Sequence, residues 1–201
     1  AGFGDDHHPM TDGGCSDCHV AHSDEPMLVK KTGEALCFEC HLETMAQFRM
    51  PSHHPVREGF LECSDCHSVH GKKQAQFVGI DDREECLGCH TEKQGPFIFE
   101  HEPVNEDCKI CHNPHGSVAN NLLKQAEPFV CLSCHPMHFH TAITGLDSDF
   151  SAPLYPGLGG TSTKDAFKKA MLTKCTQCHS QVHGSDLPSQ GITSLGQGLT
   201  R

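Results

Sequence analysis

The cysteines of this 201-residue chain all lie in one short pattern, C-x-x-C-H, which occurs seven times. The first cysteines are Cys15, Cys37, Cys63, Cys86, Cys108, Cys131 and Cys175, the second are Cys18, Cys40, Cys66, Cys89, Cys111, Cys134 and Cys178, and the closing histidines are His19, His41, His67, His90, His112, His135 and His179. The pattern is typical of covalent haem attachment, because the two thiols form thioethers with the haem vinyl groups and the histidine binds the iron. Zinc sites, redox dithiols or a disulfide scaffold give no reason for a histidine after every second cysteine. The motifs therefore predict seven haem c groups, each with covalent attachment and an iron ion.

The rest of the composition does not suit an ordinary globular core. Only 36% of the residues are hydrophobic, Trp is absent and Tyr occurs once. Side chains alone would bury too little apolar surface to offset the ordering entropy of the chain. A haem macrocycle is a large apolar disc, and seven motifs leave about 29 residues per haem. We therefore expect the polypeptide to wrap the haems and not to fold without them.

Charge and hydropathy narrow the class of protein. The formal net charge is −11 with histidine neutral. This charge argues against nucleic-acid binding, because proteins bind nucleic acid mainly through Lys and Arg. No apolar run reaches about 18 residues, so no transmembrane segment is expected. The cysteine usage suits an exported protein, and the start at Ala1 is interpreted as a mature, processed form. The expected location is periplasmic or outer-membrane-associated, alternatively extracellular.

Histidines outside the motifs recur at fixed offsets. The first six motifs form three doublets, which is typical of an array of repeats. A His-x-Pro precedes each doublet, at His7-His8-Pro9, His53-His54-Pro55 and His101-Glu102-Pro103, and each leading motif continues as C-x-x-C-H-x-x-H, which adds His22, His70 and His115. One spare histidine for each iron predicts bis-histidine ligation. We expect His7, His53 and His101 to be ligands because they fit His-x-Pro, and His8 and His54 stay open as alternatives.

The spare histidine of a leading motif is not expected to bind the iron of that motif. His22 lies three residues after His19 and cannot readily reach the opposite face of the same haem, so it would bind a neighbouring one. The seventh motif stands alone, and its candidate ligands are His183 after it and His138 or His140 before it. One of these positions is then unused or serves another iron. The six Met residues fall at no repeated offset and are expected to be packing residues.

Short elements are expected to position these residues. The predicted fold is mainly irregular with short α-helices and little or no β-structure, a multihaem cytochrome c array wrapped around a chain of haems. Residues 1–140 would form three tandem dihaem repeats, and residues 141–174 a haem-free linker with an amphipathic helix at 163–173. Residues 175–201 would hold the seventh motif and an extended tail rich in Gly and Ser.

The sequence resembles a known family. The stretch HEPVNEDCKICHNPHGS, followed by LL and then CLSCH, is similar to the doubled-CxxCH cytochromes, and CTQCHSQVHGSDLPSQ resembles the C-terminus of the MtrA/DmsE-type decahaem electron conduits. The resemblance implies a staggered haem chain, with bis-histidine ligation by the His-x-Pro and C-x-x-C-H-x-x-H histidines. The chain departs from that family in having seven motifs instead of ten, and in the stretch from residue 141 to 174.

These features predict a heptahaem electron-transfer relay in extracellular or anaerobic respiration, with no catalysis of its own. Expected partners are other redox proteins such as cytochromes, an outer-membrane porin, or copies of the chain itself. The alternative is a subunit of a polymeric extracellular cytochrome filament, for which the lone seventh motif and the surplus histidines would be suited. A multihaem reductase is a weaker alternative, because it needs an open iron position and no C-x-x-C-K motif occurs.

Overall fold

The computed structural model describes residues 13–25, 28–70, 82–135, 174–177 and 179–186. Some residues and segments that the sequence singles out lie outside this part of the chain. They are His7, His8, His138, His140 and Cys178, together with the expected helix at 163–173 and the tail beyond residue 186.

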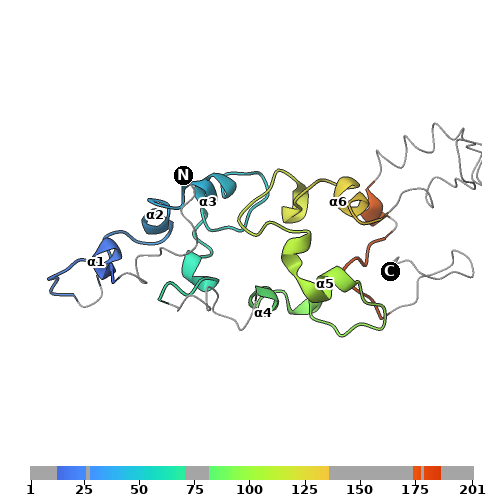
Figure 1. The fold of residues 1–201 in the computed structure, drawn as a ribbon, viewed down its shortest axis with the longest axis horizontal. Coiled ribbons are helices and arrows are strands. Elements are labelled where there is room, and N and C mark those ends of the chain that lie inside the picture. The colour runs from blue at the N-terminus through green and yellow to red at the C-terminus, as the bar shows by residue number, and fades with distance from the viewer. Residues whose placement is uncertain (1–12, 26–27, 71–81, 136–173, 178, 187–201) are drawn as a thin grey trace, which may run out of the picture. The chain divides into compact units, whose positions relative to one another are not determined.

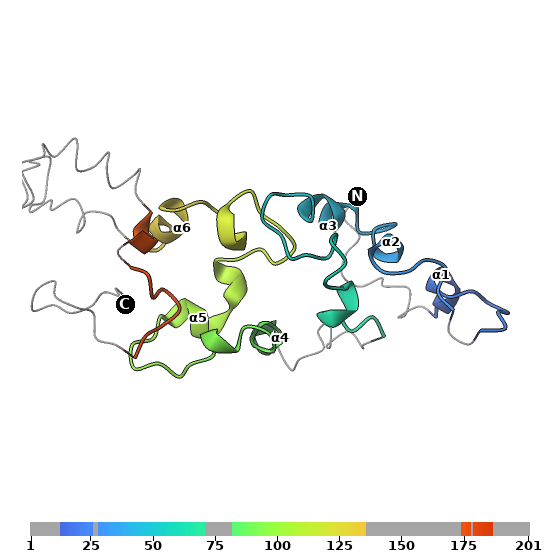
Figure 2. The ribbon, with the colours of Figure 1, turned by 180° about the vertical axis from the view of Figure 1, so that it is seen from behind.

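Short helices joined by irregular chain make up the described residues, as both ribbon views show (Figures 1 and 2). The α-helices are α1 (Cys15–Cys18), α2 (Glu34–Cys37), α3 (Leu42–Gln47), α4 (Asp82–Leu87), α5 (Glu102–Glu106) and α6 (Phe129–Leu132). The 3-10 helices are η2 (Cys63–Asp65), η3 (Thr91–Lys93), η4 (Cys108–Ile110), η5 (Asn120–Leu122) and η7 (Cys175–Gln177). The first cysteine of every motif lies within one of these helices, so the helices serve mainly to present the motifs.

Each C-x-x-C-H motif closes in one helical turn. In all seven motifs the histidine N–H donates to the carbonyl of the first cysteine, with N···O distances of 2.9 to 3.1 Å. Residues four apart lie on one face of such a turn. The bond therefore places the first thiol and the iron-binding imidazole on the same side, as attachment to one haem requires.

Strand-like backbone pairing is sparse in the described residues. Within the described ranges it consists of isolated antiparallel bridges, which join His19 to Val29, Ser52 to Ser117 and Phe99 to Ser185. No strand is assigned to any of these residues. The prediction of mainly irregular chain with short helices and little or no sheet is confirmed.

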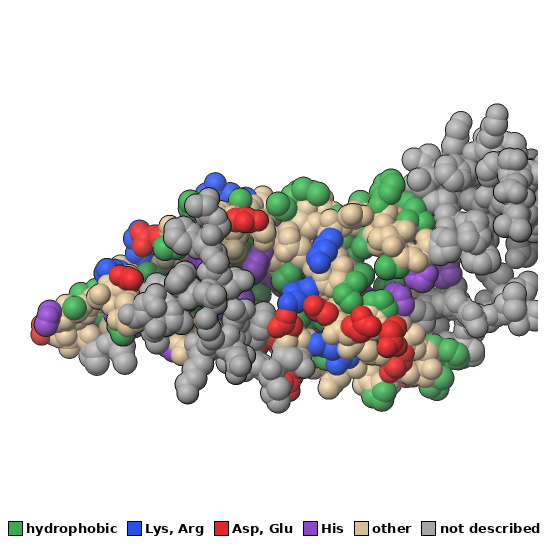
Figure 3. Space-filling model, viewed as in Figure 1, with side chains coloured by type: hydrophobic (Ala, Val, Ile, Leu, Met, Phe, Trp, Pro, Cys, Tyr) green, Lys and Arg blue, Asp and Glu red, His purple; other side chains and the backbone are tan. Residues whose placement is uncertain are grey.

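The described residues contain almost no side-chain core. Their buried hydrophobic residues are Phe48, Val56, Leu87 and Ala119. Large apolar side chains reach the surface in separate places instead (Figure 3), and Phe60 and Ile98 are 79% and 75% exposed. Such a core cannot offset the entropy of ordering the chain, so another apolar component must be enclosed.

Two compact units make up the chain. One comprises residues 1–94 and 106–122 and contains the first five motifs; the other comprises residues 95–105 and 123–201 and contains the last two. Among the described residues, no helix is long and apolar enough to cross a bilayer. The expected division into three repeats, a linker and a seventh-motif segment stays a prediction.

Candidate haem sites

Imidazole rings from distant parts of the sequence lie close together in pairs. Within the unit that holds the first five motifs, the ring centres are 5.9 Å apart in His19–His70, 5.9 Å in His67–His115 and 6.3 Å in His54–His90. Within the other unit, they are 6.0 Å apart in His101–His135. Each pair joins the histidine of one motif to one spare histidine.

These separations fit two ligands of a single iron. A metal–imidazole bond is about 2 Å long and the ring centre lies about 1 Å beyond the nitrogen, so imidazoles on opposite faces of one haem have centres about 6 Å apart. The observed 5.9 to 6.3 Å agrees with this value. In each pair the motif histidine also brings its own two cysteines. The residues present therefore fit a doubly ligated haem c at four motifs.

The spare histidine of a leading motif faces the preceding doublet. His70 lies three residues after His67, yet its ring is paired with His19. His115 follows His112 at the same offset and is paired with His67. The spacing predicts that such a histidine serves a neighbouring haem, and these contacts point to the leading haem of the preceding doublet. We call this the relayed position; ligation itself stays a proposal.

Backbone carbonyls orient several of these rings. The Nδ1–H of His54 donates to the carbonyl of Pro114 at 2.7 Å, that of His101 to Val182 at 2.8 Å, and that of His112 to Asn121 at 2.8 Å. Donation from Nδ1 leaves Nε2 as the unprotonated nitrogen, which is the form that binds a metal. For His115, burial lowers the pKa below its usual value, and nearby His67 adds to this. Both effects favour neutral, ligating imidazoles.

His54, and not the expected His53, is the residue beside His90. The Nδ1 of His53 lies 2.6 Å from the Met50 carbonyl, and its Nε2 lies 3.2 Å from a carboxylate oxygen of Glu58. The Glu58 carboxylate raises the pKa of His53, and the Met50 carbonyl adds to this. Both ring nitrogens of His53 are therefore engaged, whereas His54 leaves its Nε2 available. We propose His54 as the ligand in place of His53.

The backbone pairing supports the proposed register over the one that His-x-Pro predicts. Ser52, two residues before His54, pairs with Ser117, two residues after His115. Phe99, two residues before His101, pairs in the same way with Ser185, two residues after His183. The two arrangements make His54 equivalent to His101, although the proline lies one residue closer to His54. No signal in the sequence alone distinguishes the two registers.

Replacing His54 by alanine should leave the iron of the fourth motif without a sixth protein ligand. The expected result is a high-spin ferric signal of about one seventh of the total haem by electron paramagnetic resonance, because an open or water-bound ferric haem is high-spin. His53→Ala is the matched control and should leave every iron low-spin. A high-spin signal in His53→Ala, with none in His54→Ala, would show that His53 is the ligand.

First cysteines of successive motifs also lie together. The Cys63 thiol donates to Cys37, which lowers the pKa of Cys37 to about 7 and raises that of Cys63. Burial raises the pKa of Cys86 to about 12, and the adjacent Cys108 thiol adds to this. In the haem-loaded protein these sulfurs are thioethers and do not titrate, but their proximity remains. It links motif two to motif three and motif four to motif five.

The last two motifs show the same contact. The Sγ atoms of Cys131 and Cys175 and a carboxylate oxygen of Glu127 lie within 4.8 Å of one another. Glu127 accepts hydrogen bonds from the backbone N–H of Thr176 at 2.9 Å and from its hydroxyl at 3.0 Å. Because both cysteines are haem attachment residues and Glu127 is held by Thr176, we assign this cluster to haem spacing and not to a separate metal ion.

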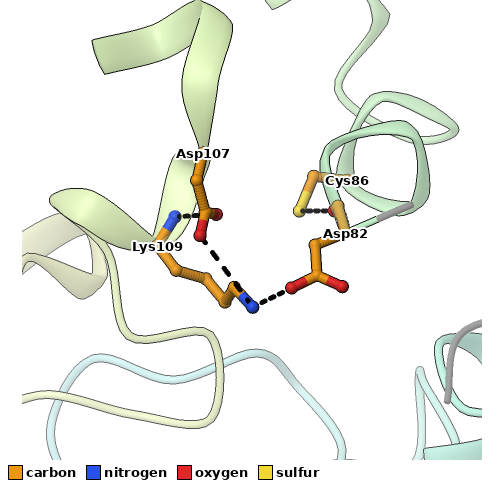
Figure 4. A network of polar contacts seen from close by, with 4 residues as sticks. All are labelled: Asp82, Cys86, Asp107 and Lys109. Carbon is orange, nitrogen blue, oxygen red and sulfur yellow. Dashed lines mark hydrogen bonds and ion pairs between the residues drawn. The ribbon is translucent and has the colours of Figure 1, made fainter. Parts of the chain in front are cut away.

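A lysine joins the fourth and fifth motifs. Lys109, inside the fifth motif, extends its ammonium group to the Asp82 carboxylate at the start of α4, and Asp107 Oδ2 lies 4.0 Å from the same nitrogen (Figure 4). The backbone N–H of Lys109 donates to the other Asp107 oxygen at 2.8 Å. Cys86, on α4, donates to the Asp82 carbonyl at 3.1 Å. Lys109, Asp82 and Asp107, which the sequence did not single out, tie η4 to α4.

Comparison with known proteins gives the same motif pattern. The family described as "Doubled CXXCH motif" matches residues 7–46, 53–95 and 101–138. The chain belongs to this family. Its members are named for the paired attachment motifs, and the motifs indicate covalently bound haem c.

Two curated relatives are multihaem or c-type cytochromes. The chain is 38% identical over 185 residues to "Multiheme cytochrome MtrA" of Shewanella baltica, which covers 91% of this chain and 53% of that protein. It is 25% identical over 172 residues to "High-molecular-weight cytochrome c" of Nitratidesulfovibrio vulgaris, which covers 67% of this chain and 31% of that protein. The chain thus spans about half the length of the first relative and less of the second. The resemblance to doubled-CxxCH multihaem cytochromes of the MtrA type is confirmed.

Proposed function

We propose that the chain is a heptahaem electron-transfer relay without catalysis of its own. The observation that supports this best is the set of four paired imidazoles, because an iron held on both faces has no open position for a substrate. A bound haem c supplies an iron that alternates between ferric and ferrous states and passes single electrons. The chain contributes the thioether cysteines, the axial ligands and the spacing.

The proposed ligand set follows from the motifs and the repeat. The fourteen cysteines attach the haems, and the seven motif histidines bind the irons from one face. Of the spare histidines, His70, His115, His54 and His101 bind irons from the other face. By the register that equates His54 with His101, His8 becomes the better candidate than His7 for the second motif. His183 stays a proposed ligand, and so does either His138 or His140.

Electron transfer along a chain of haems requires neighbouring motifs to lie close together. His67 and His70 are three residues apart and face different partner rings, so the first and third haems share one short segment. His112 and His115 join the third and fifth in the same way. The contacts of Cys37 with Cys63 and of Cys86 with Cys108 bring the second and fourth haems into the series. Electrons would therefore pass within each unit over short distances.

Replacing His70 by alanine should open the iron of the first motif and not that of the third. We expect about one seventh of the haem to become high-spin, and free imidazole to restore the low-spin state. In a protein that also lacks the first haem, through Cys15→Ser and Cys18→Ser, the same replacement should add no high-spin signal. If His70→Ala still adds a high-spin signal in the protein without the first haem, His70 binds the iron of another motif.

Carbon monoxide tests the relay against the reductase alternative. A fully reduced relay, with every iron held by two histidines, should show no change in its haem absorption when carbon monoxide is added. His70→Ala serves as the positive control and should bind it at one iron. Binding by the unmodified protein would reveal an open position and favour a reductase.

The proposed setting is respiratory electron transfer by an exported protein, periplasmic or outer-membrane-associated. Its partners would be other redox proteins, including cytochromes and an outer-membrane porin, and the acidic charge of −11 favours basic docking surfaces on them. A subunit of a cytochrome filament stays the alternative function. A filament subunit would use a surplus histidine at its surface, and His22 is an exposed histidine outside the motifs.

A further inference from the structure

A glutamate side chain lies between the attachment cysteines of the last two motifs. Cys131 belongs to the sixth motif and Cys175 to the seventh, and the helices that hold them, α6 and the orange-red η7, lie side by side in both ribbon views (Figures 1 and 2). A carboxylate oxygen of Glu127 and the two Sγ atoms lie within 4.8 Å of one another. Because these sulfurs bond to the edge of each macrocycle, the carboxylate is close to both haems.

Two hydrogen bonds hold the Glu127 carboxylate in place. One oxygen accepts from the backbone N–H of Thr176 at 2.9 Å, and the other accepts from the Thr176 hydroxyl at 3.0 Å. Both oxygens act as acceptors, as those of an ionised carboxylate do. Glu127 and Thr176 are half-buried, so water surrounds this charge only in part.

No cation offsets this carboxylate in the part of the chain that the structure describes. Among those residues no Lys or Arg, the exposed Lys174 beside Cys175 included, forms an ion pair with Glu127. The fourth and fifth motifs differ in this respect, because the ammonium group of Lys109 contacts the Asp82 carboxylate there. Glu127 therefore places an unpaired negative charge next to two haem attachment sites.

A negative charge beside a haem opposes the reduction of its iron. Reduction adds one electron and lowers the positive charge of the iron, so a nearby anion favours the ferric state and lowers the reduction potential. Salt and water screen such an interaction less when the charge is partly buried than when it is fully exposed. The position of Glu127 thus suits it to change the potentials of the sixth and seventh haems together.

We propose that Glu127 lowers the reduction potentials of the sixth and seventh haems through its charge. It is not an iron ligand, and no bond forms or breaks when it acts. Each iron takes up one electron from a redox partner and passes from ferric to ferrous, and the carboxylate makes that step less favourable at both sites. This inference rests on the proposed relay and names a residue that regulates two of its haems.

The test is a redox titration of the complete haem-loaded chain, followed by haem absorption. Glu127→Gln removes the charge but keeps the size of the side chain and an oxygen that can accept from Thr176. The equilibrium constant for reduction should rise about tenfold at two of the seven haems, which moves their potentials about 59 mV upward. Glu127→Asp keeps the charge and should remain closer to the unmodified chain than Glu127→Gln does.

Glu43→Gln is the matched control, because it removes an equal charge from an exposed position on α3. Solvent screens an exposed carboxylate, so this change should alter the equilibrium constant of any haem by less than about twofold.

A second measurement assigns the shift to the sixth haem. The ring of His101 is paired with that of His135 at 6.0 Å, so His101→Ala should make the sixth iron high-spin and give it a separate signal in electron paramagnetic resonance. In this background Glu127→Gln should raise, by the same amount, the potential at which the high-spin ferric signal disappears.

A titration curve of Glu127→Gln that shifts no more than that of Glu43→Gln would overturn the proposal. Equal shifts in Glu127→Asp and Glu127→Gln would also overturn it, since the charge would then not be the cause. If His101→Ala gives no high-spin iron, the ligand assignment of the relay fails, while the absorption titration still decides the role of Glu127. The two failures are therefore distinguishable.

Discussion

Produced without covalent haem attachment, the chain should be unfolded. The described residues bury only four hydrophobic side chains, and the helices that hold the motifs are at most six residues long. Helices shorter than about 12 residues are marginal in water without tertiary packing. The apolar discs that would supply this packing are then missing. We expect the far-ultraviolet circular dichroism spectrum of an unfolded chain and no cooperative thermal transition.

The contribution of the haems to folding can be measured by comparing the chain with and without them. The haem-loaded protein should show a cooperative transition, and a variant with all fourteen cysteines replaced by serine should show none. Loss of structure in the variant cannot be attributed to lost disulfides, because none of the described cysteines forms a disulfide. A cooperative transition in the haem-free variant would mean that the polypeptide has a core of its own.

Gly116→Ala should be the most disruptive single exchange of a small side chain in the described residues. The added Cβ would lie 1.9 Å from the carbonyl oxygen and 2.6 Å from the carbonyl carbon of Gln47, and these backbone atoms cannot rotate away as a side chain could. The collision would separate Ser117 from Ser52, whose two backbone bonds of 2.8 and 3.2 Å hold the segments together. We expect a loss of about 2 kcal/mol or more in the free energy of unfolding.

Gly88→Ala is the matched control, because its Cβ would meet the Glu85 carbonyl oxygen at 3.4 Å, which is ordinary contact. Its effect should stay within about 0.5 kcal/mol. Denaturant titration of both haem-loaded variants measures the difference. Gly116→Ala should also raise high-spin iron, since His115 lies next to the altered residue and faces His67. Equal midpoints for the two variants would mean that the close approach at Gly116 does not contribute to stability.

The attachment motifs can be recognised from the sequence alone because bond chemistry fixes their pattern. Two thioethers and one imidazole on a single haem need C-x-x-C-H, and in the structure each motif forms the same turn. The lack of sheet and of long helices in the part of the chain that the structure describes follows similarly, since a chain with so few apolar residues cannot build layers of its own. The short, irregular fold is a consequence of composition.

The sequence alone does not select among the candidate distal ligands, because the selection depends on contacts between segments far apart. The choice of His54 over His53 depends on the bond to Pro114, 60 residues away, and on Glu58, which engages His53. His70 follows the third motif, yet its ring is paired with His19 of the first motif, so this candidate ligand lies beside a motif that precedes it in the sequence. Likewise, Lys109 contacts Asp82 across 27 residues with no repeated pattern to indicate it. Repeats identify candidates for such roles, but register decides among them.

Spin quantitation of the ferric protein by electron paramagnetic resonance, measured against total haem, tests the central claim most directly. If every iron is held by two histidines, the low-spin signals should account for all seven haems, with no high-spin signal above background. A high-spin signal equal to one haem or more in the unmodified protein would show an iron without its second histidine, and would contradict the relay.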